Sequence, residues 1–448
     1  MTDYQSTDYQ SKSWWLESLP KTITPNPELA GKDKADVVVI GGGYTGLSVG
    51  YHLKQLNPAM DVRVIESDVC GYGASGRNGG FSMTLFGLTK GITKFRFNDE
   101  KARAAHGYME EAVDYLHDFI TQNQIDCDYE RSGYLLVGTS KGQVRRVEHD
   151  FKIIEKWGST GIERWDRARL AEEFNTDFYK IGWFEPRCGI INPAKLARGM
   201  KELAEAQGVT VYENSPVTGF SKTGASGYTV KTENGELQSE YLVFATNAYS
   251  ILFPQLKSLQ RPVFTYIVMS EPLTDAQLNS IGWQSRAGVE DARDLIHYYR
   301  LTKDNRIVMG GGDVSFTYSN DLNIDLNDKI FAHLEHHVIE IFPQLKEIRF
   351  THRWGGPVSV TLDMAPAIGY LGDDKKAIFS LGCLGHGVSL TTYNGLTIAE
   401  MITGQNSSRT EMFFVGRKII PLPPDLITQT ASLAIRGFMR LEDRLYYK

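Results

Sequence analysis

A run of β-branched residues that passes directly into a glycine-rich turn and a helix constrains this chain more than any other feature. Residues 36–40 read DVVVI, and GGGYTGLSVGYHLKQL follows at once. Continuous β-branched and aliphatic runs are typical of parallel strands buried on both faces. Gly41, Gly43 and Gly46 fit the spacing G-x-G-x-x-G, in which glycine lets the backbone turn tightly. The segment therefore predicts the strand–turn–helix unit of a doubly wound α/β sheet.

A second strand and an acidic residue follow at the spacing of a dinucleotide-binding unit. The run DVRVIES contains Glu66, which stands 20 residues after Gly46. An acid at this distance accepts hydrogen bonds from ribose hydroxyls, and the N–H groups that open the helix at Tyr44 and Thr45 point at a pyrophosphate. The Glu66 carboxylate would repel a 2′-phosphate, which argues against an NADP-type ligand. NAD and FAD both stay open at this point.

The second glycine-rich stretch, CGYGASGRNGG (70–80), decides between these two ligands. A plain NAD domain would enter its next helix here, whereas the longer FAD needs another loop along its path. Ser75, Arg77 and Asn78 can donate to phosphate or ribityl oxygens. The small residues expected to make room for the cofactor are Ala74, Gly76, Gly79 and Gly80. The loop therefore favours FAD.

The two glycine-rich segments together resemble the FAD-dependent amine and amino-acid oxidoreductases of the D-amino-acid oxidase superfamily. The nearest branch includes the γ-glutamylputrescine, glycine and sarcosine oxidases. Segments 13–20, 189–220, 241–250, 353–371 and 378–402 continue the resemblance in family order. It implies an α/β FAD-binding Rossmann-like domain of the glutathione-reductase type, interleaved with an α+β substrate domain built on a mostly antiparallel sheet.

Five segments follow from this interleaving. Residues 1–95, 189–255 and 350–448 are expected to form the FAD-binding domain, and residues 96–188 and 256–349 the substrate domain. An amphipathic helix is predicted within the last segment, in PDLITQTASLAIRGFMRLEDRLYYK. We expect this helix to pack on the cofactor domain, with peripheral membrane contact as the alternative.

The resemblance implies further cofactor contacts beyond the two glycine-rich segments. The residues it adds are Val217, Ala245, Thr246, Gly385, His386, Gly387 and Val388. The helix that follows SLGCLGHG should turn its N-terminus toward the flavin, where its dipole stabilises negative charge on the reduced ring. The role expected for His386 is electrostatic and positional, and its alternative is a structural histidine in a glycine turn.

The resemblance also bears on the linkage of the flavin. Some members of the superfamily tether it through a cysteine shortly before the segment that matches TLD. The corresponding stretch here, WGGPVSV, has no cysteine, and Cys383 lies later in a glycine turn. Non-covalent FAD is expected.

The chemistry implied by the resemblance is oxidation of a C–N bond. Hydride passes from the carbon next to an uncharged amine to flavin N5, the imine is hydrolysed by water, and O₂ reoxidises the flavin. The expected substrate is a small amine or amino acid, such as γ-glutamylputrescine, glycine or sarcosine. Two other functions stay open: a dehydrogenase that passes electrons to a quinone or carrier, and a flavoprotein that serves the maturation of another enzyme.

Candidate catalytic residues lie in the second domain as well as at His386. Strand alternation places Tyr298 and Arg300 on one face and Tyr299 on the other, and Trp354 heads a segment that the family places near the flavin. Arg261 and Arg300 could clamp an anionic substrate tail through paired N–H donors. Each of these residues is equally consistent with ordinary sheet packing.

Composition excludes several other classes. A net charge of −6 argues against a nucleic-acid partner, and four cysteines without CxxC spacing indicate neither a zinc site nor a disulfide framework. HLEHH (His333, His336 and His337) is predicted to be a solvated helix face, so no metal is expected. A polar N-terminus without an apolar core, and the lack of an 18-residue apolar run, predict a cytoplasmic protein without a transmembrane segment.

Overall fold

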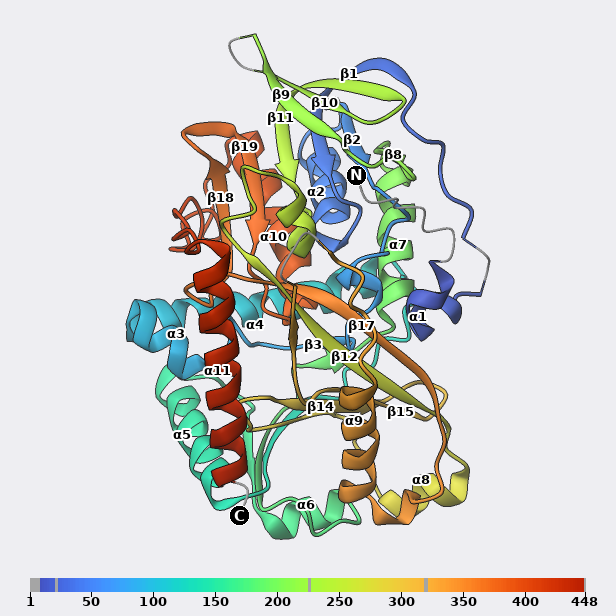
Figure 1. Cartoon of the computed structure of the whole chain (residues 1–448), viewed down its shortest axis with the longest axis vertical. Coiled ribbons are helices and arrows are strands. Elements are labelled where there is room, and N and C mark those ends of the chain that lie inside the picture. The colour runs from blue at the N-terminus through green and yellow to red at the C-terminus, as the bar shows by residue number, and fades with distance from the viewer. Residues whose placement is uncertain (1–8, 21–22, 225–226, 318–320, 447–448) are drawn as a thin grey trace.

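Two β-sheets lie toward opposite ends of the molecule, with helices packed around and between them (Figure 1). The computed structural model describes residues 9–20, 23–224, 227–317 and 321–446. Each sheet is assembled from segments that are far apart in the sequence, so the chain crosses between the two several times.

The first sheet contains the strand that precedes the glycine-rich turn. Its spatial order is β18 (Ala367–Leu371), β19 (Asp374–Leu381), β11 (Gly235–Phe244), β1 (Gly31–Ile40), β2 (Val62–Ile65) and β8 (Thr210–Tyr212), with β10 (Gly227–Lys231) and β9 (Gly219–Thr223) extending from β11. Strands β19, β11, β1, β2 and β8 pair in parallel. The four aliphatic residues 37–40 are almost fully buried, as the continuous apolar run predicts.

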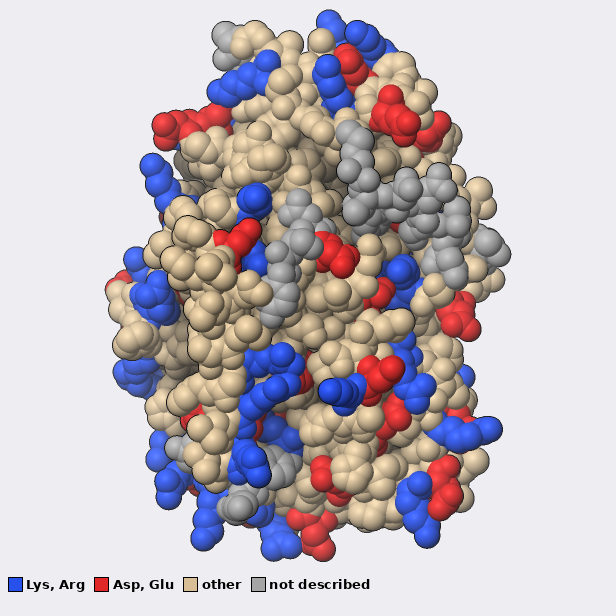
Figure 2. Space-filling view, in the orientation of Figure 1, with Lys and Arg blue, Asp and Glu red and all other residues tan. Residues whose placement is uncertain are grey.

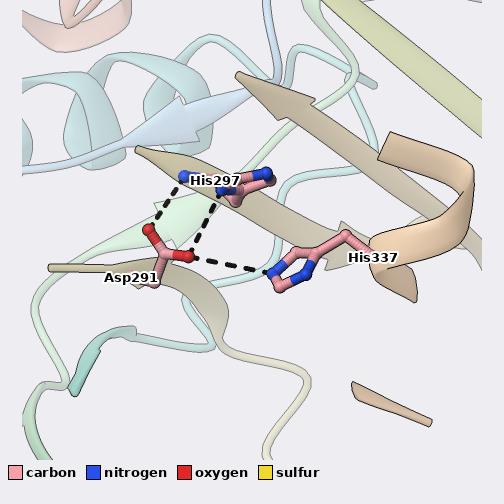
Figure 3. A group of neighbouring side chains, drawn as sticks. All are labelled: Asp291, His297 and His337. Carbon is pink, nitrogen blue, oxygen red and sulfur yellow. Dashed lines mark hydrogen bonds and ion pairs between the residues drawn. The ribbon is translucent and has the colours of Figure 1, made fainter. Parts of the chain in front are cut away.

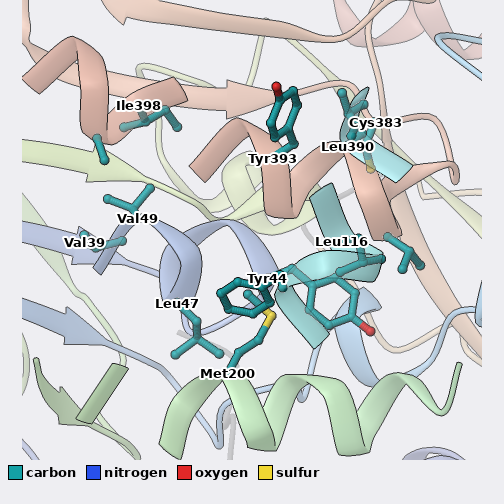
Figure 4. Close-up of a cluster of buried hydrophobic side chains, with 14 of the residues drawn as sticks. Val39, Tyr44, Leu47, Val49, Leu116, Met200, Cys383, Leu390, Tyr393 and Ile398 are labelled. Carbon is teal, nitrogen blue, oxygen red and sulfur yellow. The ribbon is translucent and has the colours of Figure 1, made fainter. Parts of the chain in front are cut away.

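Helices α2 (Tyr44–Leu56), α7 (Pro193–Ala206) and α10 (Gly387–Thr403) pack against this sheet. Figure 4 shows their shared core, which includes Leu47 of α2, Met200 of α7 and Leu390 of α10. Helices α2 and α10 cross closely, since a Cβ added at Gly395 would lie 2.4 Å from the side chain of Ser48. This contact fixes the crossing between the middle of α10 and the N-terminal half of α2.

The second sheet is mostly antiparallel. Its order is β16 (Ser315–Phe316), β12 (Arg261–Pro272), β15 (Arg306–Gly311), β14 (His297–Leu301), β13 (Gly288–Asp291), β4 (Tyr134–Gly138), β6 (Ile181–Glu185) and β5 (Glu163–Trp165), with β17 (Phe350–Val360) on the other edge of β12. The pair β13 and β4 is parallel. The predicted α/β and α+β combination is confirmed.

The remaining elements are short strands and surrounding helices. They are α1 (Trp14–Glu17), α3 (Lys90–Phe97), α4 (Asp99–Gln122), α5 (Lys141–Trp157), α6 (Arg167–Glu173), α8 (Asp275–Ile281), α9 (Asp328–Ile341), α11 (Asp425–Tyr446), β3 (Phe81–Ser82) and β7 (Gly189–Ile190), together with the 3₁₀ helices η1 (Gln10–Lys12), η2 (Ala74–Gly76), η3 (Asn247–Leu252) and η4 (Pro343–Leu345).

The boundary expected at residue 350 is placed too early. Strand β17 pairs with β12 along most of its length, with Trp354 opposite Ile267, so the second sheet continues to Val360. The resemblance had assigned this segment to the cofactor domain because it contacts the flavin. A strand of the substrate sheet can also make that contact, because β17 lies against the 70–80 loop.

Helix α11 packs mainly along the second sheet and α5 rather than on the cofactor domain, which corrects the expectation from sequence (Figure 1). Arg436 and Arg440 pair with Asp313 beyond β15, and the Asp443 carboxylate accepts backbone N–H bonds from residues 294 and 295. Apolar side chains on its outer face stay exposed: Leu426, Ile427, Leu433, Phe438, Leu441 and Leu445. None of the described helices is both long and apolar enough to cross a membrane.

The helix crossing at Gly395 generates a stability prediction. Gly395→Ala should lower the free energy of unfolding by about 1–3 kcal/mol, because the added methyl group overlaps Ser48 and must push α10 away from α2. The matched control is Gly437→Ala on α11, where nothing lies within 4 Å of an added Cβ and alanine favours the helix. Thermal melts should show a lower midpoint for the first variant only, and equal midpoints would contradict the close crossing.

Candidate active site

The first glycine-rich turn brings the start of α2 against the ends of two strands. Gly41 has φ of +109°, and a Cβ there would lie 2.6 Å from the carbonyl oxygen of Ala245. A Cβ at Gly46 would lie 1.9 Å from the carbonyl oxygen of Gly41. Only glycine permits both approaches, so the spacing read from the sequence has a direct packing cause.

Glu66 lies immediately after β2, beside this turn. Its Oε2 accepts the backbone N–H of Gly42 at 2.7 Å, and its Oε1 accepts the N–H of Asp68 at 3.1 Å. Burial raises the pKa of this carboxyl, and the two backbone donors act against that rise. The side chain is therefore held at the carboxyl end of the strand, where an adenosine ribose binds in dinucleotide folds.

The second glycine-rich stretch folds back onto the first. Ser75 Oγ accepts the backbone N–H of Tyr44, the first residue of α2, at 3.1 Å. The N–H of Gly71 donates to the carbonyl of Gly42 at 3.1 Å. A small cavity of about 20 Å³ lies nearby, and Thr45 and Ala245 line it. Both loops thus border the route that a dinucleotide would follow from the first sheet.

The glycines within the 70–80 loop also pack closely against other parts of the protein. A Cβ at Gly76 would meet the carbonyl oxygen of Gly71 at 2.2 Å, and one at Gly80 would meet that of Ile191 at 2.3 Å. A Cβ at Gly79 would lie 2.6 Å from the Tyr298 ring. Contacts within the protein already exclude side chains at these positions, so the glycines have a packing cause as well as the cofactor contact predicted for them.

Asn78 and Arg77 make different hydrogen bonds within the loop. The Asn78 amide donates to the Ala74 carbonyl and accepts the Gly80 N–H, so it closes the loop on itself. Arg77 donates through Nε to the Tyr72 carbonyl at 2.8 Å, while its buried Nη2 has no hydrogen-bond partner among the described residues. An unpartnered guanidinium N–H in this position fits an anionic or carbonyl oxygen of a bound cofactor.

A cavity of about 350 Å³ lies where this loop, α10 and the second sheet meet. The loop contributes Ala74, Arg77, Asn78 and Gly79; β17 contributes Trp354 and residues 355–358; the start of α10 contributes Gly385, His386 and Val388. Residues of α11 and the segment before it close another side. This volume is in the range of small-ligand sites, and the cavity brings together residues predicted for the cofactor and for the substrate.

The N-terminus of α10 faces this cavity. His386 is the N-cap residue and makes no side-chain cap bond. Because Gly385, His386 and Val388 line the cavity, the first N–H groups of the helix lie at its edge. The His386 ring is fixed by its Nδ1, which lies 3.1 Å from the Gly87 carbonyl oxygen and therefore carries the proton. Burial lowers the pKa of His386 to about 4, so the ring is neutral at pH 7.

Tyr298 and Trp354 form part of the cavity floor. Trp354 Nε1 donates to the Arg77 carbonyl at 2.8 Å, which ties β17 to the loop. The Tyr298 ring lies between Gly79 and Gly310, because a Cβ at Gly310 would meet it at 2.4 Å. Gly310 lies within β15, and its lack of a side chain makes room for this ring.

Arg300 lies outside the cavity lining, which corrects its expected role at the substrate. Its Nε donates to the Gly79 carbonyl at 2.7 Å and its Nη2 to the Ile191 carbonyl at 2.5 Å, while the guanidinium stacks 4.7 Å from the Trp15 ring. It faces the loop as alternation predicted, but its donors hold backbone. Arg261 does line the cavity, where it pairs with Asp425 at 3.0 Å.

The other predicted cofactor residues lie around the first sheet. Thr246 is the N-cap residue of η3 and hydrogen-bonds Ser250, and Gly387 begins α10. Val217 is half-buried beside the core formed by β1 and β11. Sequence reasoning missed Glu290, a buried carboxyl in the cavity wall, because a single acid in an alternating strand carries no motif.

The predicted solvated face of HLEHH is wrong for His337 alone, because His333 and His336 are both exposed. His336 is exposed, but His337 is buried, and His333 Nε2 lies 3.2 Å from His297 Nε2. Figure 3 shows His297 and His337 converging on Asp291 behind the sheet. The sequence signal was the amphipathic pattern, which places residues 333 and 337 one helical turn apart.

The side chains of Asp291, His297 and His337 are close enough together to hold a cation. In this structure the positive charge is the guanidinium of Arg293. Its Nε lies 3.0 Å from the Asp291 carboxylate, its Nη1 3.0 Å from His297 Nδ1 and its Nη2 3.3 Å from His337 Nε2. The guanidinium therefore stands where a metal ion would bind. A second, more polar cavity borders the cluster between α9 and α11, and Figure 2 shows basic side chains gathered over this strip.

Comparison with known proteins gives consistent matches along the chain. Residues 36–401 match the model of a family described as FAD dependent oxidoreductase. The chain is 32% identical over 406 residues to gamma-glutamylputrescine oxidoreductase of Escherichia coli (strain K12), with 90% of each protein covered. It is 25% identical to sarcosine oxidase subunit beta of Arthrobacter sp, covering 79% of this chain and 83% of that protein.

A solved structure shows the same fold. Glycine oxidase from Geobacillus kaustophilus superposes with a TM-score of 0.72 at 17% sequence identity. The match covers 86% of this chain and 100% of the glycine oxidase.

The position of Glu66 predicts a loss of cofactor affinity on substitution. Glu66→Gln keeps one acceptor for the Gly42 N–H but replaces a charge-assisted ribose contact, so FAD affinity should fall by about ten- to a hundredfold. The control is Glu240→Gln, whose carboxylate pairs with Lys376 at the exposed surface of the same sheet. Titration of apoprotein with FAD measures both, and unchanged affinity in Glu66→Gln would place the ribose elsewhere.

None of the four cysteines, all of which the structure describes, lines the main cavity, and this predicts that the flavin is held without a covalent bond. Cys383 is the cysteine nearest the start of α10; burial raises the pKa of its thiol, and the residue does not line the main cavity. Acid precipitation should leave the yellow colour in the supernatant. Colour that stays with the washed pellet of wild type and disappears from that of Cys383→Ser would show a tether at this residue.

Proposed function

This chain belongs to the FAD-dependent oxidoreductase family, and from that membership we propose that it oxidises the C–N bond of a small linear amine with O₂ as the electron acceptor. The family match confirms the predicted FAD cofactor, the resemblance and the enzyme class. The protein is thus an FAD-dependent oxidoreductase acting on amines or amino acids. The particular substrate and acceptor belong to the proposal.

The observation that carries the proposal is the composition of the main cavity. One wall is formed by the 70–80 loop and the start of α10, and the facing wall by Tyr298, Trp354 and their neighbours on the second sheet. A relative that matches along 90% of this chain is named as an oxidoreductase of gamma-glutamylputrescine, a linear amine. The cavity gives such a molecule a place between the cofactor residues and the sheet.

Bound FAD supplies the oxidising chemistry, since it accepts hydride from the carbon next to the amine nitrogen. The residues of the protein orient the substrate and set the electrostatics of the cavity. The N-terminal N–H groups of α10 stabilise negative charge at the cavity edge, and neutral His386 keeps a fixed orientation there. Apolar and aromatic groups such as Phe81, Tyr298 and Trp354 disfavour an isolated ammonium, which promotes the neutral amine that can release hydride.

Two observations support a linear amine over an α-amino acid. The arginine expected to clamp a carboxylate, Arg300, is used on backbone carbonyls, and Arg261 is already paired with Asp425. An α-carboxylate next to the reacting carbon needs a free donor pair in the cavity. The sarcosine- and glycine-type substrates therefore rank behind a γ-glutamylputrescine-type amine in this proposal.

Anaerobic flavin reduction tests the substrate class. In stopped-flow mixing, γ-glutamylputrescine should bleach the flavin absorbance, with sarcosine and glycine slower by an order of magnitude or more because neither Arg261 nor Arg300 is free to clamp a carboxylate. Re-admission of air should restore the colour and yield one peroxide per turnover. Bleaching that reverses only with an artificial electron acceptor would make the protein a dehydrogenase, and the failure of every amine would favour a role in maturation of another enzyme.

A further inference from the structure

A buried glutamate lies in the wall of the main cavity, one strand away from Tyr298. Glu290 of β13 is directly opposite Tyr298 of β14 in an antiparallel pair, so both side chains point to the same face of the sheet. The same row continues through Gly310 and Ile267 to Trp354. Neighbouring strands are about 5 Å apart, which places Glu290 close to the ring that touches Gly79 of the cofactor loop.

Glu290 differs from the other charged groups that line this cavity. Apart from neutral His386, those groups have ion-pair partners: Asp294 pairs with Arg146, Arg261 with Asp425, Arg77 with Asp325, and Asp313 with Arg436. Glu290 is 6% exposed, and no basic group among the described residues lies within ion-pair distance of it. A carboxyl buried in an apolar cavity without a cation is costly when ionised.

The groups that face Glu290 favour its protonated form. Burial is the main cause of a rise in the pKa of Glu290 to about 8, and the charges of Asp291 on the same strand and Asp150 of α5 add to it. Lys90 of α3 and the Tyr134 hydroxyl of β4 act in the opposite direction. Lys90 is itself 3.6 Å from Asp150, so its charge is shared. Burial therefore favours the neutral carboxylic acid form of Glu290 at pH 7.

We propose that Glu290 binds the reacting amine of the substrate, and that the site therefore selects amines that arrive as cations. This inference rests on the proposed function, because it assumes that an amine enters this cavity. A positive group beside Glu290 would supply the counter-charge that the wall lacks, and Glu290 would then release its proton to solvent. Arg261 and Arg436 of the wall are paired with Asp425 and Asp313. The buried Nη2 of Arg77, which has no hydrogen-bond partner among the described residues, is assigned above to the cofactor.

The bound substrate ammonium can then transfer one proton to the Glu290 carboxylate. The substrate ammonium and the Glu290 carboxylate exchange a proton: the N–H bond breaks, its electron pair stays on nitrogen, and an O–H bond forms on the carboxylate. The products are a neutral amine and a carboxylic acid, with no change in total charge. An apolar cavity favours this neutral pair over two charges, and the neutral amine is the form that can give up hydride.

Calorimetry of the oxidised holoenzyme with tert-butylammonium tests the inference without turnover. This cation has no hydrogen on the carbon next to nitrogen, so it cannot be oxidised. Titrations at pH 7 in buffers of different ionisation enthalpy should show net proton release on binding, since burial raises the pKa of Glu290 to about 8 and its carboxyl is mostly protonated at pH 7. Pivalate, which has the same shape and the opposite charge, should bind at least tenfold more weakly.

Substitution assigns the proton to Glu290. In Glu290→Gln, proton release should disappear and tert-butylammonium should bind at least tenfold more weakly, whereas Glu290→Asp should keep the release. The matched control is Glu185→Gln, because Glu185 is also fully buried in the second sheet but accepts a bond from Thr84 outside the cavity lining. That variant should behave as wild type.

Several results would overturn the inference. One is a wild-type protein that releases no proton on binding, and another is pivalate that binds it as tightly as tert-butylammonium does. Glu290→Gln that keeps both the affinity and the proton release would have the same consequence. If Glu290→Gln does not fold, the proton count of wild type and its preference over pivalate decide alone. A flavin that amines reduce normally in Glu290→Gln would end this inference and leave the proposed function intact, whereas wild type that no amine reduces would remove the proposed function itself.

Discussion

The active site depends on the contact of one loop, residues 70–80, with both halves of the molecule. Ser75 accepts the first N–H of α2 on the side of the parallel sheet. On the other side, the Arg77 carbonyl accepts Trp354 Nε1, and Gly79 packs against the Tyr298 ring. Three of its glycines leave no room for a Cβ: Gly79 packs against the Tyr298 ring, and Gly76 and Gly80 pack against the carbonyl oxygens of Gly71 and Ile191. The cavity lies between this loop, the start of α10 and the second sheet.

This contact explains which predictions from sequence succeeded. The strand, the G-x-G-x-x-G turn and Glu66 interact within about thirty residues of chain, so their spacing alone specifies the geometry. The antiparallel second sheet could be anticipated from alternating runs. The sequence could not show to which sheet β17 belongs. Its pairing with β12, which sets Arg261 opposite Val360, depends on tertiary contacts that no local pattern records.

The predictions for single polar residues had the same limit. Arg300 and Tyr298 were assigned correctly to one face, yet Arg300 reaches backbone carbonyls of the loop while Tyr298 reaches the cavity. Of the histidines of α9, only His337 is buried, and its Nε2 contacts Arg293, which comes from a different segment. Glu290 carries no motif at all. Its significance comes from the ion pairs that its neighbours have and it lacks.

The central claim is that the cavity between the 70–80 loop, α10 and the second sheet holds both the flavin ring and the amine. A crystal structure of the yellow holoenzyme soaked with tert-butylammonium tests it most directly. We expect the flavin ring against the start of α10 and the loop, facing Tyr298, with the ligand nitrogen within hydrogen-bond distance of the Glu290 carboxylate. A flavin ring outside this cavity, or a cation bound away from Glu290, would contradict it.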